Sequence, residues 1–299
     1  MNTLIVVLGP TGIGKTDLAI NLAKELKTEI LSADSRQFYK ELKIGTAVPT
    51  DNQLLEIKHH FIGNISIHDY YNASLFEIST IELLNTLFKT KKTVILVGGS
   101  GMYIDAVCNG IDDLPEVDQE IREYLLEKYE NEGIESLRFE LKRLDPVYYD
   151  IVDLRNPKRI LKGLEICMMT GKTYTSFRKA VKKERNFEII KIGLNMERSK
   201  LYERIDKRVD LMIENGLIDE ARQFYPHKSI NALNTVGYKE LFEYFDDKYD
   251  LNKAIELIKR NSRRYAKRQL SWFMRDKDIN WFEPNNYRPI INYINSKEV

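Results

Sequence analysis

Close to its amino terminus the chain reads Gly9-Pro10-Thr11-Gly12-Ile13-Gly14-Lys15-Thr16, which matches the phosphate-binding pattern G-x-x-x-x-G-K-[ST]. The apolar run 4–8 precedes this stretch and the helix-like segment 17–27 follows it, which is the strand–loop–helix setting that the pattern requires. In such a loop, backbone N–H groups turn toward an anion and the helix presents its positive end to it. A glycine-rich turn without a ligand is the alternative. The stretch predicts a di- or triphosphate site without identifying the ligand.

Side chains in and beyond this loop are candidates for holding the ligand. Lys15 supplies a positive charge, and the Thr16 hydroxyl is a candidate ligand for Mg²⁺. Two arginines lie four residues apart on one predicted helix, where like charges repel unless an anion lies between them. The alternative is a solvated face eased by the neighbouring acids Glu203, Asp206 and Asp210. The predicted diphosphate-binding residues are Gly9, Pro10, Thr11, Gly12, Ile13, Gly14, Lys15, Thr16, Arg204 and Arg208.

The composition is that of an ordinary globular protein, and 299 residues are enough for two domains. The net charge is +1, so a nucleic-acid surface would have to be a local patch. Cys108 and Cys167 are far apart, which indicates a reducing compartment without a disulfide framework. No apolar run approaches the roughly 18 residues of a membrane span, and the first strand leaves no room for a signal peptide. We therefore expect a cytoplasmic protein.

Strand and helix signals alternate along the first third of the chain. A short strand at 29–32 leads into the segment 34–37, and Ser74-x-x-Glu77 predicts a capping box that opens a helix to about residue 89. A strand at 93–97 then ends at the glycine-rich segment 98–101. This alternation predicts a parallel α/β sheet, in which functional loops lie beyond the carboxyl ends of the strands. We expect the phosphate loop and both of these segments to converge on one cleft.

The middle of the chain changes character. Residues 112–186 are charged and helix-periodic, contain Asp-Pro and Asn-Pro breaks and carry no strand signal, which predicts an all-helical insertion. The core would then comprise residues 1–111 and 187–299. The elements expected in its second part are a strand at 187–194, helices at 199–215 and 251–274, and a short strand at 280–282.

The last long helix carries a one-sided basic stripe. Its members follow the i, i+3, i+4, i+7, i+8 spacing of one helix face and are Arg260, Arg263, Arg264, Lys267 and Arg268. No acidic residue lies within 259–268. Such a stripe is typical of nucleic-acid binding, and a solvated helix face is the alternative. A weaker second patch in the insertion contains Lys158, Arg159 and Lys162.

Two common chemistries find no support. A motor-type ATPase would place an Asp at the end of an apolar strand to help hold Mg²⁺, whereas the strand at 93–97 ends in Gly-Gly-Ser. The four histidines lack zinc-type spacing and cysteine partners, so we expect them to be structural. They are His59, His60, His68 and His227.

Several further motifs occur in a fixed order after the phosphate loop. They are Asp34-Ser35-Arg36-Gln37-Phe38-Tyr39, Ile44-Gly45-Thr46-Ala47, Val97-Gly98-Gly99-Ser100-Gly101-Met102-Tyr103, Arg159…Leu164-Glu165, Arg204…Arg208, Val236-Gly237-Tyr238 and Ala266-Lys267-Arg268-Gln269. With this set the chain resembles the tRNA dimethylallyltransferases over nearly its whole length. Two positions depart from that family: Ser100 stands where Thr is common and keeps the hydroxyl, and Val48 stands where Lys is common.

The resemblance implies a P-loop kinase-like core that takes dimethylallyl diphosphate. The dimethylallyl group would pass to N6 of the adenosine 3′ of a tRNA anticodon, with release of diphosphate. By resemblance, Asp34 is the general base for the N6 proton. Lys15, Arg208 and the Ser100 hydroxyl, together with Mg²⁺, would stabilise the departing diphosphate. One copy suffices for this chemistry, so we expect a monomer.

The same resemblance, with the basic patches, identifies candidate tRNA contacts. The insertion and the basic helix would bind the anticodon stem-loop, and the segment 34–37 would contact a target base turned out of its stack. The expected residues are Asp34, Ser35, Arg36, Gln37, Ser100, Arg122, Lys158, Arg159, Lys162, Gly237, Tyr238, Arg263, Arg264, Lys267, Arg268 and Gln269.

Three other functions are compatible with a phosphate loop. They are a kinase of a nucleoside or small metabolite, an adenylate isopentenyltransferase and a non-catalytic RNA-binding protein. The basic stripe argues against the first two, since neither must hold a long polyanion. The third is disfavoured because Lys15, Thr16, Asp34 and Arg208 are all intact.

Overall fold

The computed structural model describes residues 1–112, 114–115, 118–178 and 182–297. The chain divides into two compact units: a core unit, Met1–Cys108 with Glu184–Val299, and an insertion unit, Asn109–Lys183. The sequence places the insertion at 112–186, so both ends of the insertion unit lie slightly earlier than expected. None of the described helices is long and apolar enough to cross a membrane.

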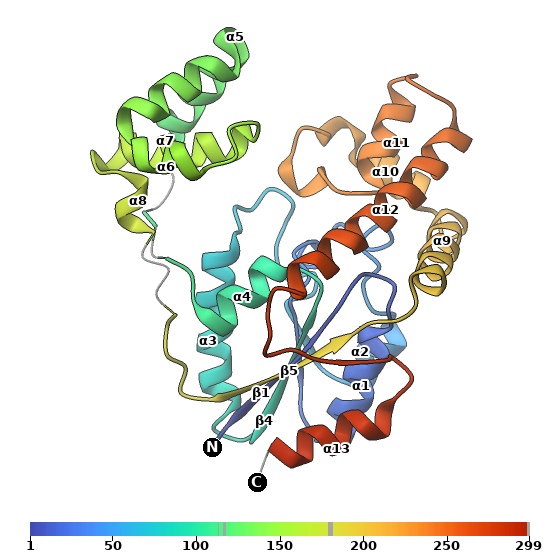
Figure 1. Ribbon diagram of the computed structural model, residues 1–299. Helices are drawn as coiled ribbons and strands as arrows, with labels where there is room; N and C mark the ends of the chain where they lie inside the picture. The colour runs from blue at the N-terminus through green and yellow to red at the C-terminus, as the bar shows by residue number, and fades with distance from the viewer. Residues whose placement is uncertain (113, 116–117, 179–181, 298–299) are drawn as a thin grey trace. The chain divides into compact units, whose positions relative to one another are not determined.

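The core unit is built on a six-stranded sheet in the order β3-β2-β4-β1-β5-β6, with every neighbouring pair parallel (Figure 1). The register pairs Val6 of the central strand with Leu96 on one side and Lys191 on the other. The predicted α/β class is confirmed. The strands are β1 (Thr3–Leu8), β2 (Ile30–Ser32), β3 (His59–His60), β4 (Thr93–Gly98), β5 (Glu188–Leu194) and β6 (Asn280–Phe282).

Successive residues of β1 enter different hydrophobic cores, because side chains alternate between the two faces of a strand. Ile5 and Val7 pack with α1 (Lys15–Glu25) and α13 (Tyr287–Lys297). Leu4, Val6 and Leu8 pack on the other face with α3 (Ala73–Leu87) and α4 (Gly101–Asn109). All six residues of β1 are buried. Coverage of both faces explains why β1 and β4 appear in the sequence as apolar runs without polar alternation.

A third hydrophobic cluster lies among the helices that follow β5, and Tyr238 is fully buried within it. The last of these helices contacts all three clusters, with Ile258 in the third, Ala266 in the first and Phe273 in the second. The helices of this region are α9 (Arg198–Glu214), α10 (Leu217–Phe224), α11 (Tyr238–Phe245) and α12 (Leu251–Phe273), with the short turns η1 (Tyr225–His227) and η2 (Asn231–Leu233). A short helix, α2 (Asp51–Glu56), precedes β3.

The insertion unit contains helices and no strand among its described residues, as the sequence predicts. Its first helix breaks at Gly133, whose φ of 77° is a backbone conformation that favours glycine. The buried Asp145 joins its parts, because its carboxylate accepts hydrogen bonds from the backbone N–H groups of Tyr148 and Thr175. The helices are α5 (Gln119–Leu144), α6 (Pro146–Ile151), α7 (Pro157–Thr170) and α8 (Tyr174–Phe177).

The start of α3 differs from the predicted capping box. Asn72 caps the helix, with its Oδ1 accepting from the backbone N–H of Leu75 at 2.9 Å. Glu77, the expected second member of the box, is buried and pairs with Arg185 at 2.8 Å. The prediction is wrong because an ion pair from a distant part of the chain holds the glutamate.

Arg185 stabilises the point at which the chain re-enters the core unit. Its Nε and Nη2 donate to the carbonyl oxygens of Val107 and Ala106, both at 2.9 Å, in addition to the pair with Glu77. We expect Arg185→Leu to lower the free energy of unfolding by about 3–5 kcal/mol, because a buried carboxylate loses its ion pair. Urea denaturation followed by tryptophan fluorescence checks this, since both tryptophans lie in the core unit.

The matched control is Lys207→Gln, which breaks the solvent-exposed ion pair between Lys207 and Glu203. Exposed pairs contribute little, so its denaturation midpoint should stay that of the parent protein. Equal shifts in the two variants would contradict the role given to Arg185.

Candidate active site

The phosphate loop closes on its own lysine. Lys15 Nζ donates to the carbonyl oxygen of Pro10 at 2.8 Å. At Gly9, where φ is 150°, an added Cβ would lie 2.7 Å from the carbonyl oxygen of Leu194, so only glycine lets the loop pass this close to β5. Burial lowers the pKa of Lys15 to about 8, an effect that Asp34 opposes. A bound anion would favour the charged ammonium again.

Helix α9 brings both predicted arginines to this loop. Arg208 Nη1 donates to the Thr11 hydroxyl at 3.1 Å. Burial lowers the pKa of Arg208, and the nearby Asp34 raises it. Arg204 Nη2 lies 3.4 Å from the position that a Cβ on Gly14 would take. The two guanidinium groups therefore lie at the loop, as an anion site requires.

The acids near these arginines in sequence bind elsewhere. Asp206 accepts from Arg263 of α12 at 2.6 Å, and Asp210 pairs with Lys259 at 2.5 Å. Because these two carboxylates bind cations of α12 and not Arg204 or Arg208, the arrangement favours a phosphate clamp over the solvated-face alternative for the two arginines.

The loop, α1, the segment after β2 and α9 enclose a cavity of about 210 Å³, called here the phosphate cavity. Most of the predicted diphosphate-binding residues line it, including Thr11, Gly12, Gly14, Lys15, Thr16, Arg204 and Arg208. Three do not. Ile13 is buried in the first hydrophobic core, and Gly9 and Pro10 shape the loop behind it.

A larger cavity of about 490 Å³, called here the acceptor cavity, lies between the segment after β2, α9 and α12. It shares Thr11, Asp34 and Arg208 with the phosphate cavity. The two spaces therefore meet at one carboxylate and one guanidinium.

Asp34 is held by its own loop. Its Oδ1 accepts from the backbone N–H of Arg36 at 3.1 Å, while Oδ2 has no hydrogen-bond partner among the described residues. This loop hydrogen bond is a structural role for Asp34, and it occupies one carboxylate oxygen only. The other oxygen is available at the junction of the cavities.

Ser100 lies behind this junction. Its hydroxyl accepts from the backbone N–H of Ser35 at 2.9 Å and donates to the Ser35 hydroxyl at 3.1 Å. The side chain is buried and lines neither cavity. Ser100 therefore positions the loop that carries Asp34, and contact with the diphosphate stays a prediction.

Arg36 and Gln37 also make contacts within the protein. The Arg36 Nη1 donates to carbonyl oxygens of η2, those of Asn231 and Ala232, both at 3.1 Å. The amide of Gln37 donates to the carbonyl oxygen of Ala47 at 3.0 Å. Arg36 lines the acceptor cavity together with Ser35, whereas Gln37 lines the phosphate cavity.

Two of the predicted tRNA contacts have side chains that are buried and bonded inside the protein, so their contact with tRNA stays a prediction. Tyr238 is fully buried and donates to Glu220 Oε1 at 2.5 Å. Gln269 accepts from the backbone N–H of Thr11 and donates to the carbonyl oxygen of Gly99, both at 2.8 Å. Gly237, in contrast, lines the acceptor cavity.

The sequence motifs include neither Tyr265, which lines the acceptor cavity, nor Glu220, which holds part of its wall. Glu220 accepts from the backbone N–H groups of residues 43–45, at 2.9 to 3.0 Å, and so holds the segment that forms one wall. An acid on a helix gives no sequence signal for such a role. Tyr265 lines the cavity, and burial and then Asp34 raise its pKa to about 12. In the sequence, Tyr265 recurs with Ile258 and Trp272 at seven-residue spacing, which is a packing pattern and gives no sign of a cavity.

The basic stripe is only partly available. Arg263 is paired with Asp206. The other members are exposed and form no ion pair among the described residues, and two of them, Arg264 and Arg268, line the acceptor cavity. These four free cations are Arg260, Arg264, Lys267 and Arg268.

The four predicted tRNA contacts of the insertion unit, which are Arg122 and the patch Lys158, Arg159 and Lys162, divide in the same way. Lys158 and Arg159 are exposed in the first turn of α7. Arg122 and Lys162 both lie near the buried carboxylate of Glu165, at 3.8 and 3.7 Å. Glu165 thus forms ion pairs with Arg122 and Lys162, while Lys158 and Arg159 are exposed to solvent.

The phosphate cavity suits magnesium bound chiefly through a ligand. Among the described residues no cluster of three metal-ligating His, Cys, Asp or Glu side chains exists. Magnesium usually needs only one or two carboxylates besides substrate phosphates and water. The Thr16 hydroxyl and the carboxylates of Asp17 and Asp34, all lining the cavity, are oxygen donors of the required kind.

Known proteins similar to this chain are named as tRNA dimethylallyltransferases. The chain is 55% identical over 292 residues to tRNA dimethylallyltransferase 1 of Bacteroides fragilis, covering 98% of this chain and 97% of the relative. It is 54% identical to the tRNA dimethylallyltransferase of Christiangramia forsetii, covering 99% and 98%. A family model described as IPP transferase matches residues 37–276.

Similar solved structures match nearly the whole of this chain. The tRNA isopentenylpyrophosphate transferase of Bacillus halodurans superposes with a TM-score of 0.73 at 33% identity, covering 99% of this chain and 97% of that one. A eukaryotic dimethylallyltransferase acting on tRNA gives a TM-score of 0.79 at 25% identity, covering 100% and 78%. On this evidence the chain belongs to the IPP transferase family.

Proposed function

We propose that this protein transfers a dimethylallyl group from dimethylallyl diphosphate to N6 of the adenosine 3′ of the anticodon in tRNA. The meeting of two cavities at Asp34 and Arg208 carries the proposal. One cavity is lined by phosphate-binding groups, and the other is larger and flanked by exposed cations. Relatives named tRNA dimethylallyltransferase support the same reaction.

Asp34 is placed to act as the general base. The amine of adenine is a weak nucleophile because its lone pair is delocalised into the ring. The unpartnered Oδ2 can accept the N6 proton while the new N–C bond forms and the allylic C–O bond breaks. The hydrogen bond from Arg36 keeps the carboxylate oriented toward the junction.

The phosphate cavity stabilises the leaving group. Negative charge develops on the diphosphate as the C–O bond breaks, and preorganised donors lower the cost of that change. Lys15, Arg204, Arg208 and the backbone N–H groups of the loop supply the donors. Mg²⁺ bound to the diphosphate oxygens would add further positive charge, and Thr16 is the residue we propose to bind it.

The tRNA would be held by charge and its target base by the acceptor cavity. The four free cations of α12 follow one helix face, and Lys158 and Arg159 offer a second contact for the anticodon stem-loop. The cavity must receive a base turned out of its stack. Every residue that lines the two cavities belongs to the core unit of one chain, so we propose a monomer, working in the cytoplasm where tRNA is found.

A transfer assay tests the proposal. Purified protein is incubated with Mg²⁺ and radiolabelled dimethylallyl diphosphate, with unmodified tRNA in one tube and AMP in another. We expect label in tRNA and none in AMP. Label in AMP alone would indicate an adenylate isopentenyltransferase, and consumption of ATP without transfer would indicate a kinase.

Replacing Asp34, the proposed general base, should slow dimethylallyl transfer strongly without changing the stability of the fold. In Asp34→Asn the amide oxygen can still accept from the backbone N–H of Arg36, but the side chain cannot take a proton. We expect kcat to fall by about 10²- to 10⁴-fold, with an unchanged denaturation midpoint. Single-turnover transfer to tRNA measures the rate. A residual rate within a factor of two of the parent would exclude Asp34 as the base.

The reaction should lose efficiency in mild alkali. Because the pKa of Lys15 is about 8 in the free protein, its ammonium group loses its proton as the pH rises through that value. Binding of an anionic substrate then weakens, so kcat/KM for dimethylallyl diphosphate should fall above about pH 8. In Lys15→Arg the fall should move to higher pH, since guanidinium stays charged. A profile that is identical in both proteins would contradict this origin.

Binding of tRNA should depend on salt through the free cations of α12. If four phosphates are neutralised, log K against log[salt] should slope at about −2.8 to −3.6. Arg264→Gln should reduce the slope by about 1. Lys89→Gln, an exposed cation after α3, serves as the control and should leave it unchanged. Filter binding measures the slopes, and a flat response would remove the stripe from tRNA binding.

A further inference from the structure

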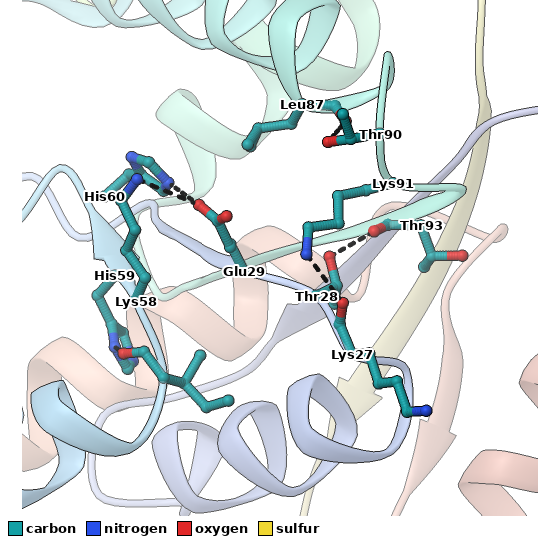
Figure 2. A network of polar contacts seen from close by, with 11 residues as sticks. Lys27, Thr28, Glu29, Lys58, His59, His60, Leu87, Thr90, Lys91 and Thr93 are labelled. Atoms are coloured by element: carbon teal, nitrogen blue, oxygen red, sulfur yellow. Dashed lines mark hydrogen bonds and ion pairs between the residues drawn. The ribbon is translucent and has the colours of Figure 1, made fainter.

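One histidine that the sequence assigns to a structural role lies in the phosphate cavity. His59 belongs to the edge strand β3, and its Nδ1 donates to the carbonyl oxygen of Ile57 at 2.8 Å (Figure 2). That bond leaves Nε2 as the remaining polar atom of the ring. Nε2 is buried and has no hydrogen-bond partner among the described residues. Buried polar atoms are nearly always bonded, so a nitrogen left open in a ligand cavity indicates a missing partner.

We propose that His59 is a further diphosphate-binding residue, whose Nε2 donates to an oxygen of the bound diphosphate while the ring is protonated. This inference rests on the function proposed above, because it assumes a diphosphate in this cavity. The ring takes its proton from solvent when the anion binds, and no bond to carbon is made or broken by His59. As the C–O bond breaks, the Nε2–H group of His59 keeps its hydrogen bond to the departing diphosphate.

The groups around His59 explain why its ring gains a proton when the diphosphate binds and not before. Burial lowers the pKa of His59 in the free protein, the bond to Ile57 raises it, and His60 lowers it again. A diphosphate would reverse this balance by placing negative charge beside the ring. The other ionisable side chains that line the cavity come from α1, the segment after β2 and α9; they are Lys15, Asp17, Asp34, Arg204 and Arg208.

The neighbouring histidine provides a matched comparison. His60 lies next to it on β3, but its Nε2 bonds to Glu29 Oε2 at 2.7 Å, and Lys58 reaches the same carboxylate at 3.6 Å (Figure 2). His60 does not line the phosphate cavity. His59 and His60 are thus both histidines of β3, but only His59 lines the cavity in which we propose that the diphosphate binds.

Calorimetry with inorganic diphosphate and Mg²⁺ at pH 7, repeated in buffers of different ionisation enthalpy, measures both affinity and proton uptake. Lys15, with a pKa of about 8, is already mostly charged at that pH, and the ionisation of diphosphate itself is common to all variants. The difference in proton uptake between the parent and a His59 variant therefore reports on His59. The informative variant is His59→Asn, whose amide can replace the bond to Ile57 but offers nothing at the position of Nε2. We expect diphosphate affinity to fall by about 10- to 100-fold and fewer protons to be taken up than by the parent protein.

The remaining outcomes distinguish this inference from the proposed function. His60→Gln should bind diphosphate and take up protons like the parent. If His59→Asn also behaves like the parent, the ring only supports the backbone and the inference is overturned, while the proposed reaction stands. If the parent protein does not bind diphosphate at all, both fail.

Discussion

One buried amide joins the parts of the site. Gln269 accepts from the phosphate loop through the N–H of Thr11 and donates to the segment after β4 through the carbonyl oxygen of Gly99. The same residue belongs to α12, the helix that contacts all three hydrophobic clusters of the core unit. Because the amide has one donor group and one acceptor group directed at different loops, an acid or an amine in its place would leave one of these bonds unmade. The phosphate cavity, the acceptor cavity and the basic stripe are therefore positioned together.

The sequence predicts well those parts of the fold in which the local pattern of apolar residues matches their burial in the structure. The strands β1 and β4 are buried along their whole length, so each appears as an apolar run whatever its neighbours are. The strand β3 gives no such signal, because its two histidines form a strand only through their pairing with β2. That failure also hid His59, whose function depends on where the edge strand places it. Local sequence carries no information about such long-range pairing.

The candidate site shows a second limit of sequence. Motifs identify residues that matter, but they do not separate contact with a ligand from contact with the protein. Tyr238 and Gln269 stand in motifs of the family, and both are buried parts of the scaffold. The basic stripe shows the same limit. Helical spacing places its cations on one face of α12, but it does not predict which acidic side chains of the neighbouring helix α9 will pair with them. There, Asp206 and Asp210 meet Arg263 and Lys259 in an antiparallel ladder, a match set by packing between α9 and α12. The phosphate loop is the exception, because its glycines, Lys15 and Thr16 form one continuous stretch of sequence whose spacing is itself the signal.

The place of the insertion has a consequence for how the protein is made. The central strand β1 leaves the ribosome first, and β4 can pair with it early, but β5 follows only after the whole insertion unit has been synthesised. Until then the nascent chain carries β1 with one row of backbone N–H and C=O groups unpaired, in the most apolar part of the sheet. The backbone bond between Lys183 and Asn109 brings the ends of the insertion together, which shortens the path that β5 must close. Synthesis that pauses or ends within the insertion would leave an open sheet edge prone to association with other chains.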